Sequence, residues 1–142
     1  MRITDVLRRK GDQVVTIGPD HTVRALLDAL AEHRVGALVV SAGSGRVDGI
    51  VSERDVVRQL QKVGAALLDQ PVSAIMTADV HTADPDASLE DLMVMMTERR
   101  IRHVPVLVDG RLAGIVSIGD VVKHRIGELQ SERDQLTAYI TG

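Results

Sequence analysis

The residue pattern with the clearest chemical potential is G-I-V-S-x-x-D, which occurs twice in the chain. Its serine and aspartate are Ser52 and Asp55 in the first copy, and Ser117 and Asp120 in the second. A serine followed three residues later by an acid at a helix start is typical of a capping box, although the acid there is usually Glu. A carboxylate held at this corner between strand and helix can also accept the hydroxyl protons of a ribose, while the helix N-terminus attracts phosphate. The pattern therefore predicts either a cap alone or a cap beside a ligand site.

The two motifs belong to a longer internal repeat. Residues 46–57 and 111–122 share eight of twelve residues at an offset of 65, and weaker similarity extends upstream. Each repeat spans about 60 residues, which is too short to bury much surface alone, so we expect the two repeats to pack face to face. The predicted boundaries are 1–63 for the first repeat, 64–72 for a linker, 73–125 for the second repeat and 126–142 for a C-terminal helical extension.

Hydropathy patterns and turn residues predict the same order of elements in each repeat: strand, helix, strand, strand, helix. Thr22 is expected to cap the first helix, and Asp109–Gly110 is expected to turn the second hairpin. The predicted strands are 14–17, 37–41, 47–52, 80–82, 103–108 and 112–117. The predicted helices are one that follows Thr22, then 53–62 and 88–99, and a last one from Val121 through Ile140.

Composition excludes several classes of function. The chain has 142 residues, 44% hydrophobic and 26% charged, as in an ordinary folded domain, but only 1% are aromatic. Nucleic-acid modules that stack bases on aromatic rings are therefore disfavoured, and a net charge of −3 gives no reason to expect nucleic-acid or membrane binding. Without cysteine, thiolate zinc sites and thiol nucleophiles are excluded. The histidines form no H-E-x-x-H pattern, so no catalytic or metal site is predicted, and the expected location is the cytoplasm.

The paired motifs resemble the cystathionine-beta-synthase (CBS) domain, which occurs in tandem as a Bateman module. The segments S-A-I-M-T at 73–77 and R-H-V-P-V at 102–106 add to this resemblance, which covers residues 4–123. It implies an α/β (α+β) fold of two pseudo-symmetric β-α-β-β-α repeats packed through their sheets. It further implies two clefts between the repeats that bind adenosine-containing ligands, and a homodimer in which two modules form a flat disc.

The resemblance also implies which positions contact the ligand. The motif aspartate would hold the ribose, the motif serine would lie near the ribose or phosphates, and residues after the first strand of each repeat would contact the adenine. Carried over by position, one site uses Thr16, Ile17, Ala37, Ser52, Arg54 and Asp55. The other uses Thr82, Ala83, Arg102, His103, Ser117 and Asp120. Because the chain lacks Phe and Trp, the adenine would lie between aliphatic side chains such as Ile17, Val39 or Val104.

The two sites are not equivalent in sequence. The first repeat has Gly36–Ala37 where the second has Arg102–His103, and the second has Ile118–Gly119 where the first has Glu53–Arg54. One site therefore receives Arg54 from within its motif, and the other receives Arg102 from the residues before a strand. This difference predicts unequal affinities or different ligands.

The hypothesis from sequence is a non-catalytic regulatory module that senses energy or redox state. Its regulatory ligand would be an adenine nucleotide (AMP, ADP, ATP or NAD(H)), and an unidentified target protein would respond to its conformation. The arginines Arg54 and Arg102 favour phosphorylated ligands over S-adenosylmethionine. The alternative is a ligand-independent homodimeric scaffold for protein interactions. The apolar spacing of Ile126, Leu129 and Leu136 fits either a seam for a partner subunit or a tail folded onto its own domain.

Overall fold

The computed structural model describes residues 1–11 and 14–141, and it confirms a mixed α/β fold made of two repeats. Five α-helices and five strands are present among the described residues, with two short 3-10 helices between the repeats. In chain order the elements are α1 (Ile3–Lys10), β1 (Thr16–Ile17), α2 (Val23–His33), β2 (Ala37–Val40), β3 (Gly49–Ser52), α3 (Glu53–Val63), η1 (Gly64–Asp69), η2 (Val72–Ala74), α4 (Leu89–Arg99), β4 (His103–Val108), β5 (Arg111–Ser117) and α5 (Ile118–Thr141).

Helices α2 and α4 begin and end in the same way, as their positions in the repeat require. Thr22 Oγ1 accepts a hydrogen bond from Ala25 N at 3.1 Å, and Ser88 Oγ accepts one from Asp91 N at 3.0 Å. These side chains satisfy backbone donors that the first turn of a helix leaves free. At the other end, Arg34 and Arg100 adopt left-handed backbone conformations with φ of 55° and 54°. Local sequence therefore fixes both helices at both ends.

Each repeat contributes a small sheet. In the first, β1 runs parallel to β2, and β2 is antiparallel to β3 with Ala37 opposite Ser52. In the second, β4 and β5 form an antiparallel hairpin. The strand predicted at 80–82 is not formed; Ala83 alone makes an isolated parallel bridge with Val106. Residues 80 and 81 instead line a cavity between the repeats.

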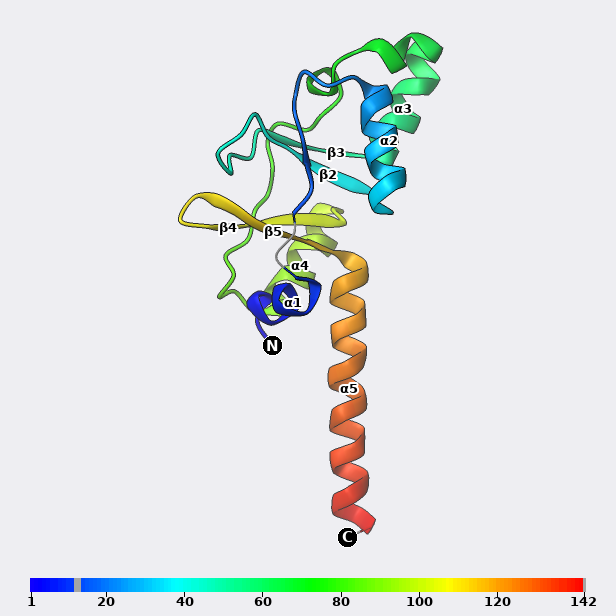
Figure 1. Ribbon diagram of the computed structural model, residues 1–142. Helices are drawn as coiled ribbons and strands as arrows, with labels where there is room; N and C mark the ends of the chain where they lie inside the picture. The colour runs from blue at the N-terminus through cyan, green and yellow to red at the C-terminus, as the bar shows by residue number, and fades with distance from the viewer. Residues whose placement is uncertain (12–13, 142) are drawn as a thin grey trace.

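The two repeats pack through their sheets, as predicted. Figure 1 shows the β2–β3 and β4–β5 hairpins next to each other, with α2 and α3 beyond one hairpin and α1 and α4 beyond the other. The hairpins are joined directly where Leu112 N donates to Gly45 O at 2.8 Å. The loop between β2 and β3 therefore contacts strand β5 of the other repeat.

Helix α1 precedes the first repeat in sequence but packs against the second. Ile3 and Val6 have no exposed surface and belong to the same buried cluster as Leu89 and Leu92. Backbone bonds anchor this contact, including Ile3 N to Ala87 O at 3.0 Å. The buried cluster of the second repeat therefore includes residues from the predicted first repeat.

The segment predicted as a linker shows the reciprocal arrangement. It forms η1 and η2, and its residues Leu67 and Val72 are completely buried in the cluster that contains Leu26. Val72 N also donates to His21 O at 2.8 Å. The segment that precedes each repeat in sequence therefore packs on the core of the other repeat. Both buried clusters cross the predicted boundaries.

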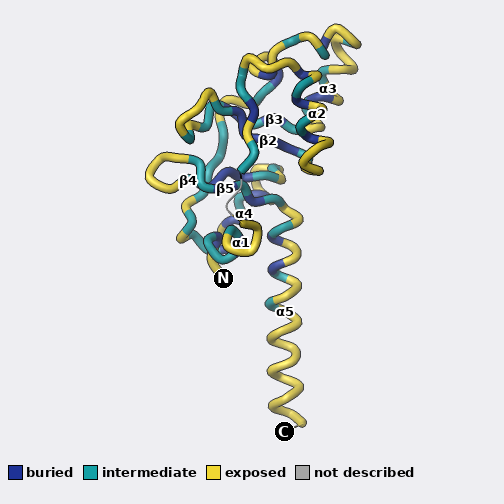
Figure 2. The backbone as a smooth tube through the Cα atoms, viewed as in Figure 1, coloured by how far each residue is buried: buried dark blue, intermediate teal, exposed yellow. Residues whose placement is uncertain are grey.

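Helix α5 is much longer than its counterpart α3. Its first turns contact the body through Val121 and His124, which are buried. From Leu129 to Thr141 every residue is exposed, and Figure 2 shows this part as a rod that leaves the body. The structure therefore does not support the alternative of a tail folded onto its own domain.

Candidate functional site

A cavity of about 410 Å³ lies between the two repeats. One wall comes from the start of β2, the end of β3 and the first turns of α3. The facing wall comes from the segment that follows η2 and from the residues around the start of β4. The lining residues are Gly36, Ala37, Ile50, Ser52, Glu53, Arg54, Asp55 and Arg58 from the first repeat, and Thr77, Asp79, Val80, His81, Arg100, Ile101, Arg102 and His103 from the second.

Asp55 is held in this cavity by the predicted capping box. Ser52 N and Ser52 Oγ both donate to Asp55 Oδ2, at 2.8 and 3.0 Å, and Asp55 N donates to Ser52 Oγ at 3.4 Å. All the bonds to the carboxylate use Oδ2. Among the described residues Oδ1 accepts no hydrogen bond, so a capped Asp55 still has acceptor capacity for a ligand's hydroxyl groups.

Four arginines line the cavity, against the three acidic side chains of Glu53, Asp55 and Asp79. One of the four, Arg54, lies in the first turn of α3, where a cation opposes the helix dipole. Its position is therefore not explained by helix stability. A planar guanidinium forms paired hydrogen bonds with phosphate oxygens, so this wall is suited to an anionic ligand.

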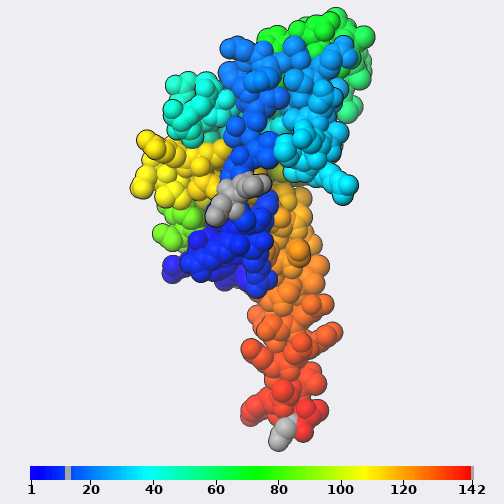
Figure 3. All heavy atoms as spheres, viewed as in Figure 1, coloured from blue at the N-terminus to red at the C-terminus, as the bar shows by residue number. Residues whose placement is uncertain are grey.

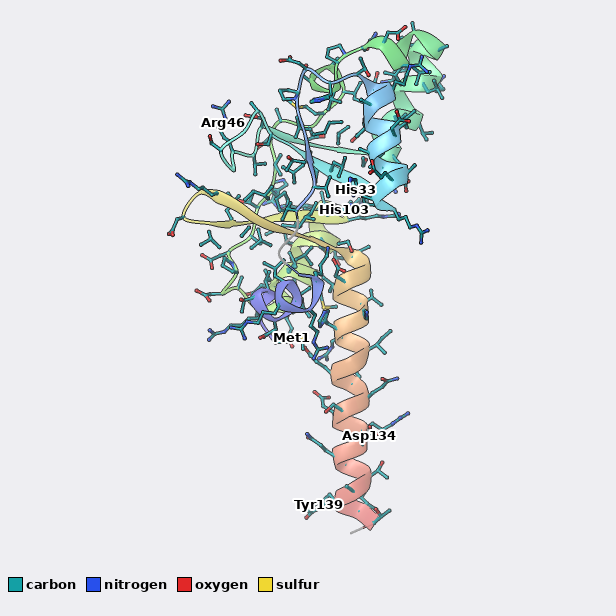
Figure 4. All side chains as sticks on the ribbon, in the orientation of Figure 1. Met1, His33, Arg46, His103, Asp134 and Tyr139 are labelled. Carbon is teal, nitrogen blue, oxygen red and sulfur yellow. The ribbon has the colours of Figure 1, made fainter. Side chains whose placement is uncertain are left out.

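His103 starts β4 and lies where the two repeats face each other, close to the end of α2 (Figure 4). Burial lowers the pKa of His103 below its ordinary value, and the nearby Lys10 cation lowers it further, whereas Asp120 and Glu53 act in the opposite direction. The imidazole is therefore neutral at neutral pH. It supplies a hydrogen-bonding edge to the cavity, and the positive charge comes from the arginines.

The second motif forms the same cap but has an extra partner. Ser117 N donates to Asp120 Oδ2 at 2.9 Å, and Asp120 N donates to Ser117 Oγ at 3.2 Å. Lys10 Nζ lies 2.8 Å from the same carboxylate oxygen, Oδ2. Burial alone would raise the pKa of Asp120, but the bonds from Lys10 and Ser117 hold it below its ordinary value. Asp120 is thus a paired carboxylate.

The cavity regroups the residues predicted from sequence. Arg102 and His103 were predicted at the site of Asp120, and His103 does pair with Ser117 of the second motif, but both residues also line the cavity of Asp55. The physical reason is that the repeats meet through their sheets, which brings the start of β4 against the end of β3. The predicted residues inside the cavity are Ala37, Ser52, Arg54, Asp55, Arg102 and His103; those outside its lining are Thr16, Ile17, Thr82, Ala83, Ser117 and Asp120.

The apolar contacts expected for an adenine also change. Ile17, Val39 and Val104 are buried in the protein interior, with at most 6% of their surface exposed. A ligand could not reach them without disrupting the core. The apolar side chains that line the cavity are instead Ile50, Val80 and Ile101.

Sequence reasoning missed the segment from Thr77 to His81, which lines the cavity and connects η2 to the bridge at Ala83. Ile50 and Thr77 exchange two backbone hydrogen bonds at 2.9 Å, which fixes the segment against β3. His81 in turn lies 3.5 Å from Arg99 at the end of α4. This segment could have been predicted from its position, because it directly precedes Thr82, where ligand contacts were expected.

No helix within the described residues is both long enough and apolar enough to cross a membrane.

Comparison with known proteins identifies relatives over almost the whole chain. The model of the CBS domain matches residues 3–62 and 72–127. The mitochondrial CBS domain-containing protein CBSX3 of Arabidopsis thaliana is 36% identical over 148 residues, covering 99% of this chain and 72% of that protein. The crystal structure of the CBS-domain containing protein ATU1752 from Agrobacterium tumefaciens has a TM-score of 0.85 and 47% identity, covering 88% of this chain and 99% of that one.

A more distant structure shares the fold. The CBS domain pair of protein MJ0100, solved in complex with 5-methylthioadenosine and S-adenosyl-L-methionine, has a TM-score of 0.80. It is 23% identical and covers 90% of this chain and 98% of that one. Both of its ligands contain adenosine.

Proposed function

Because the chain belongs to the CBS-domain family, we propose that it is a non-catalytic regulatory module that binds a phosphorylated adenosine ligand between its repeats. The observation that carries this proposal is that one cavity is lined both by Asp55 from one repeat and by Arg102 and His103 from the other. In the proposed complex the carboxylate accepts the ribose hydroxyl protons. The arginines bind the phosphates, and the aliphatic lining contacts the adenine.

The size and charge of the cavity support this ligand class. A volume of about 410 Å³ falls within the range of small-molecule sites. The adenosine ligands of the MJ0100 domain pair support the nucleoside part, and the arginines of this chain extend the proposal to phosphates. The proposed ligands are therefore AMP, ADP, ATP or NAD(H), and the proposed location is the cytoplasm.

The proposed mechanism is a shift between arrangements of the two repeats. A ligand that contacts both walls binds most tightly to the arrangement in which the walls have the correct separation. Such a ligand raises the population of that arrangement by its difference in affinity for the two states. A target protein that recognises one arrangement would then respond to the ligand concentration.

A thermal-shift screen tests the proposed ligand. We expect one or more of AMP, ADP, ATP and NAD(H) to stabilise the wild-type protein. A ligand present at about 100 times its Kd adds roughly 2.7 kcal/mol, which raises Tm by several degrees. Asp55→Asn should lose most of this shift, because it removes the carboxylate charge. It keeps an oxygen that can accept the bond from Ser52 N, so the cap of α3 is preserved.

The matched control for Asp55→Asn is Asp69→Asn, because Asp69 is an exposed aspartate outside the cavity. It should keep the full ligand-induced shift. An equal shift in wild type and Asp55→Asn would refute the assignment of Asp55. A flat response of the wild type across the panel would refute the nucleotide proposal and favour the scaffold.

The exposed half of α5 supports a homodimer, in either the sensor or the scaffold. Ile126, Leu129, Leu136 and Ile140 recur at spacings of three, four and seven residues on one face, and each is at least 48% exposed. Apolar residues at this spacing are typical of a helix that packs against another helix. We propose that a second copy of the chain covers this face.

The homodimer is tested by sedimentation equilibrium. Leu136→Glu should weaken dimerisation by about tenfold or more, because the interface would have to bury a carboxylate. Ala138→Glu is the matched control, since Ala138 lies on the opposite side of α5 from Leu136. A monomeric wild type, or equal weakening by both variants, would rule out this face as the seam.

A further inference from the structure

Helix α1 and the segment around Met76, which leads into the second repeat, occupy equivalent positions in the two halves of the structure. A Cβ built on Gly49 would lie 2.7 Å from Met76 Sδ, and one built on Gly114 would lie 2.6 Å from Leu7 Cδ2. Gly49 and Gly114 are the first residues of the two G-I-V-S-x-x-D motifs. Leu7 and Met76 therefore occupy equivalent places, each packed closely on the glycine of one motif.

Three residues beyond these equivalent positions, the two halves carry opposite charges. Leu7 is followed by Lys10, whereas Met76 is followed by Asp79. Lys10 forms an ion pair with the second motif carboxylate, Asp120. Asp79 lines the cavity of the first motif carboxylate, Asp55, and like charges cannot form such a pair. Among the described residues no ion pair engages Asp55, so the first carboxylate is left to a ligand, whereas the second already has a cation.

Lys10 is held at Asp120 by two hydrogen bonds. Its Nζ donates to Asp120 Oδ2 and to Ile115 O, each at 2.8 Å. Asp120 Oδ2 also accepts the capping bond from Ser117 N, so this oxygen is engaged by two donors. The side chains of Lys10 and Asp120 are only 34% and 22% exposed. Ribose hydroxyls approaching this carboxylate would have to compete with an ammonium group that is already in place.

Helix α1 is well anchored, so this contact does not depend on a loose terminus. Ile3 and Val6 are fully buried, and Figure 3 shows α1 directly beside the first turns of α5, which contain the last residues of the second motif. Lys10 ends α1 and Asp120 starts α5. The packing of the two helices therefore brings the ammonium group to the carboxylate.

We infer that Lys10 is an intramolecular occupant of the second cleft, the space at Asp120 that corresponds by symmetry to the cavity at Asp55. This inference rests on the proposed function. The module then binds one adenosine ligand per chain with full affinity, at Asp55. A second ligand binds only by displacing Lys10 from Asp120, so Lys10 determines which of two related motifs is used.

Removing the ammonium group should strengthen binding at the second cleft. Lys10→Met keeps most of the apolar stem and removes the cation. A partly exposed ion pair is worth up to about 1 kcal/mol, so we expect the second cleft to bind about fivefold more tightly in the variant. The effect should be the same for adenosine and for AMP, because the released group is the carboxylate that contacts the ribose.

Calorimetric titration with adenosine and with AMP tests the inference. The second cleft is isolated in an Asp55→Asn background, and Lys10→Met is added to it. The matched control in the same background is Arg8→Met, because Arg8 is an exposed cation on α1 without a contact to Asp120. The wild type is titrated in parallel and should bind one equivalent before any weaker step.

The possible results separate the inference from the proposed function. Tighter binding of both probes with Lys10→Met, and no gain with Arg8→Met, supports the inference. Weaker binding of AMP with Lys10→Met means that Lys10 is a phosphate ligand, which overturns it. Two equally tight sites in the wild type, or no change with Lys10→Met, also overturn it and leave the proposed function standing. A wild type that binds neither probe overturns the inference, and the proposed function falls with it only if ADP, ATP and NAD(H) also leave Tm unchanged in the thermal-shift screen.

Discussion

The double substitution Ile3→Ala/Val6→Ala is expected to lower the free energy of unfolding by about 3–7 kcal/mol, because both side chains are completely buried in the cluster of the second repeat. For a chain of this length the total stability is on the order of 7–20 kcal/mol, so the loss is a large fraction of it. Urea denaturation followed by circular dichroism measures it. The only tyrosine, Tyr139, is exposed on α5 and would give little signal.

A matched surface variant of the same helix separates packing from helix propensity. Arg8→Ala/Arg9→Ala also makes two changes to alanine in α1, but both side chains are exposed. It should change the free energy of unfolding by less than about 1 kcal/mol. A loss below about 1 kcal/mol for Ile3→Ala/Val6→Ala would mean that α1 does not contribute to the core of the second repeat.

The elements that could be predicted from sequence are those fixed by neighbouring residues. Thr22 was sufficient to locate the start of α2, because a capping side chain bonds to a backbone N–H three residues away. Asp109 and Gly110 both adopt positive φ in the predicted hairpin turn. The repeat of G-I-V-S-x-x-D identified the two strand-to-helix corners for the same reason, since each capping box is closed within four residues.

The features that escaped prediction depend on contacts between distant segments. In α1, Ile3 and Val6 show only that the helix has one apolar face, and nothing local says that this face packs on Leu92 of the other repeat. The same applies to Leu67 in the predicted linker. Because the opening segment of each repeat packs on the core of the other, the position of a residue in the sequence does not indicate in which core its side chain is buried.

The site was partly predictable for a related reason. Asp55 was identified because it belongs to a short motif of neighbouring residues. That Arg102 and His103 also reach the cavity of Asp55 was not predicted, because the pairing between repeats is set by how the sheets face each other. The ion pair between Lys10 and Asp120 spans 110 residues, and only the folded structure brings its two members together.

The double substitution Arg54→Gln/Arg102→Gln should reduce the affinity for AMP and ATP by about 100-fold or more. Hydrogen bonds between a guanidinium and a charged group contribute about 1.5–3 kcal/mol each, so losing two costs at least about 3 kcal/mol. Adenosine has no phosphate and should bind with nearly unchanged affinity. The protein should remain folded, because both arginines are exposed and Arg54 lies unfavourably at a helix N-terminus.

Calorimetric titration of the three ligands measures this difference, and the control must carry the same change in net charge. Arg24→Gln/Arg133→Gln meets this condition, because both arginines form exposed ion pairs outside the cavity. Equal losses in both variants would mean that the overall charge of the protein, screened by salt, attracts the nucleotide. Equal losses for adenosine and AMP would mean that Arg54 and Arg102 shape the cavity without contacting phosphate. Only a loss confined to the phosphorylated ligands and to the cavity variant identifies the two arginines as the phosphate-binding wall.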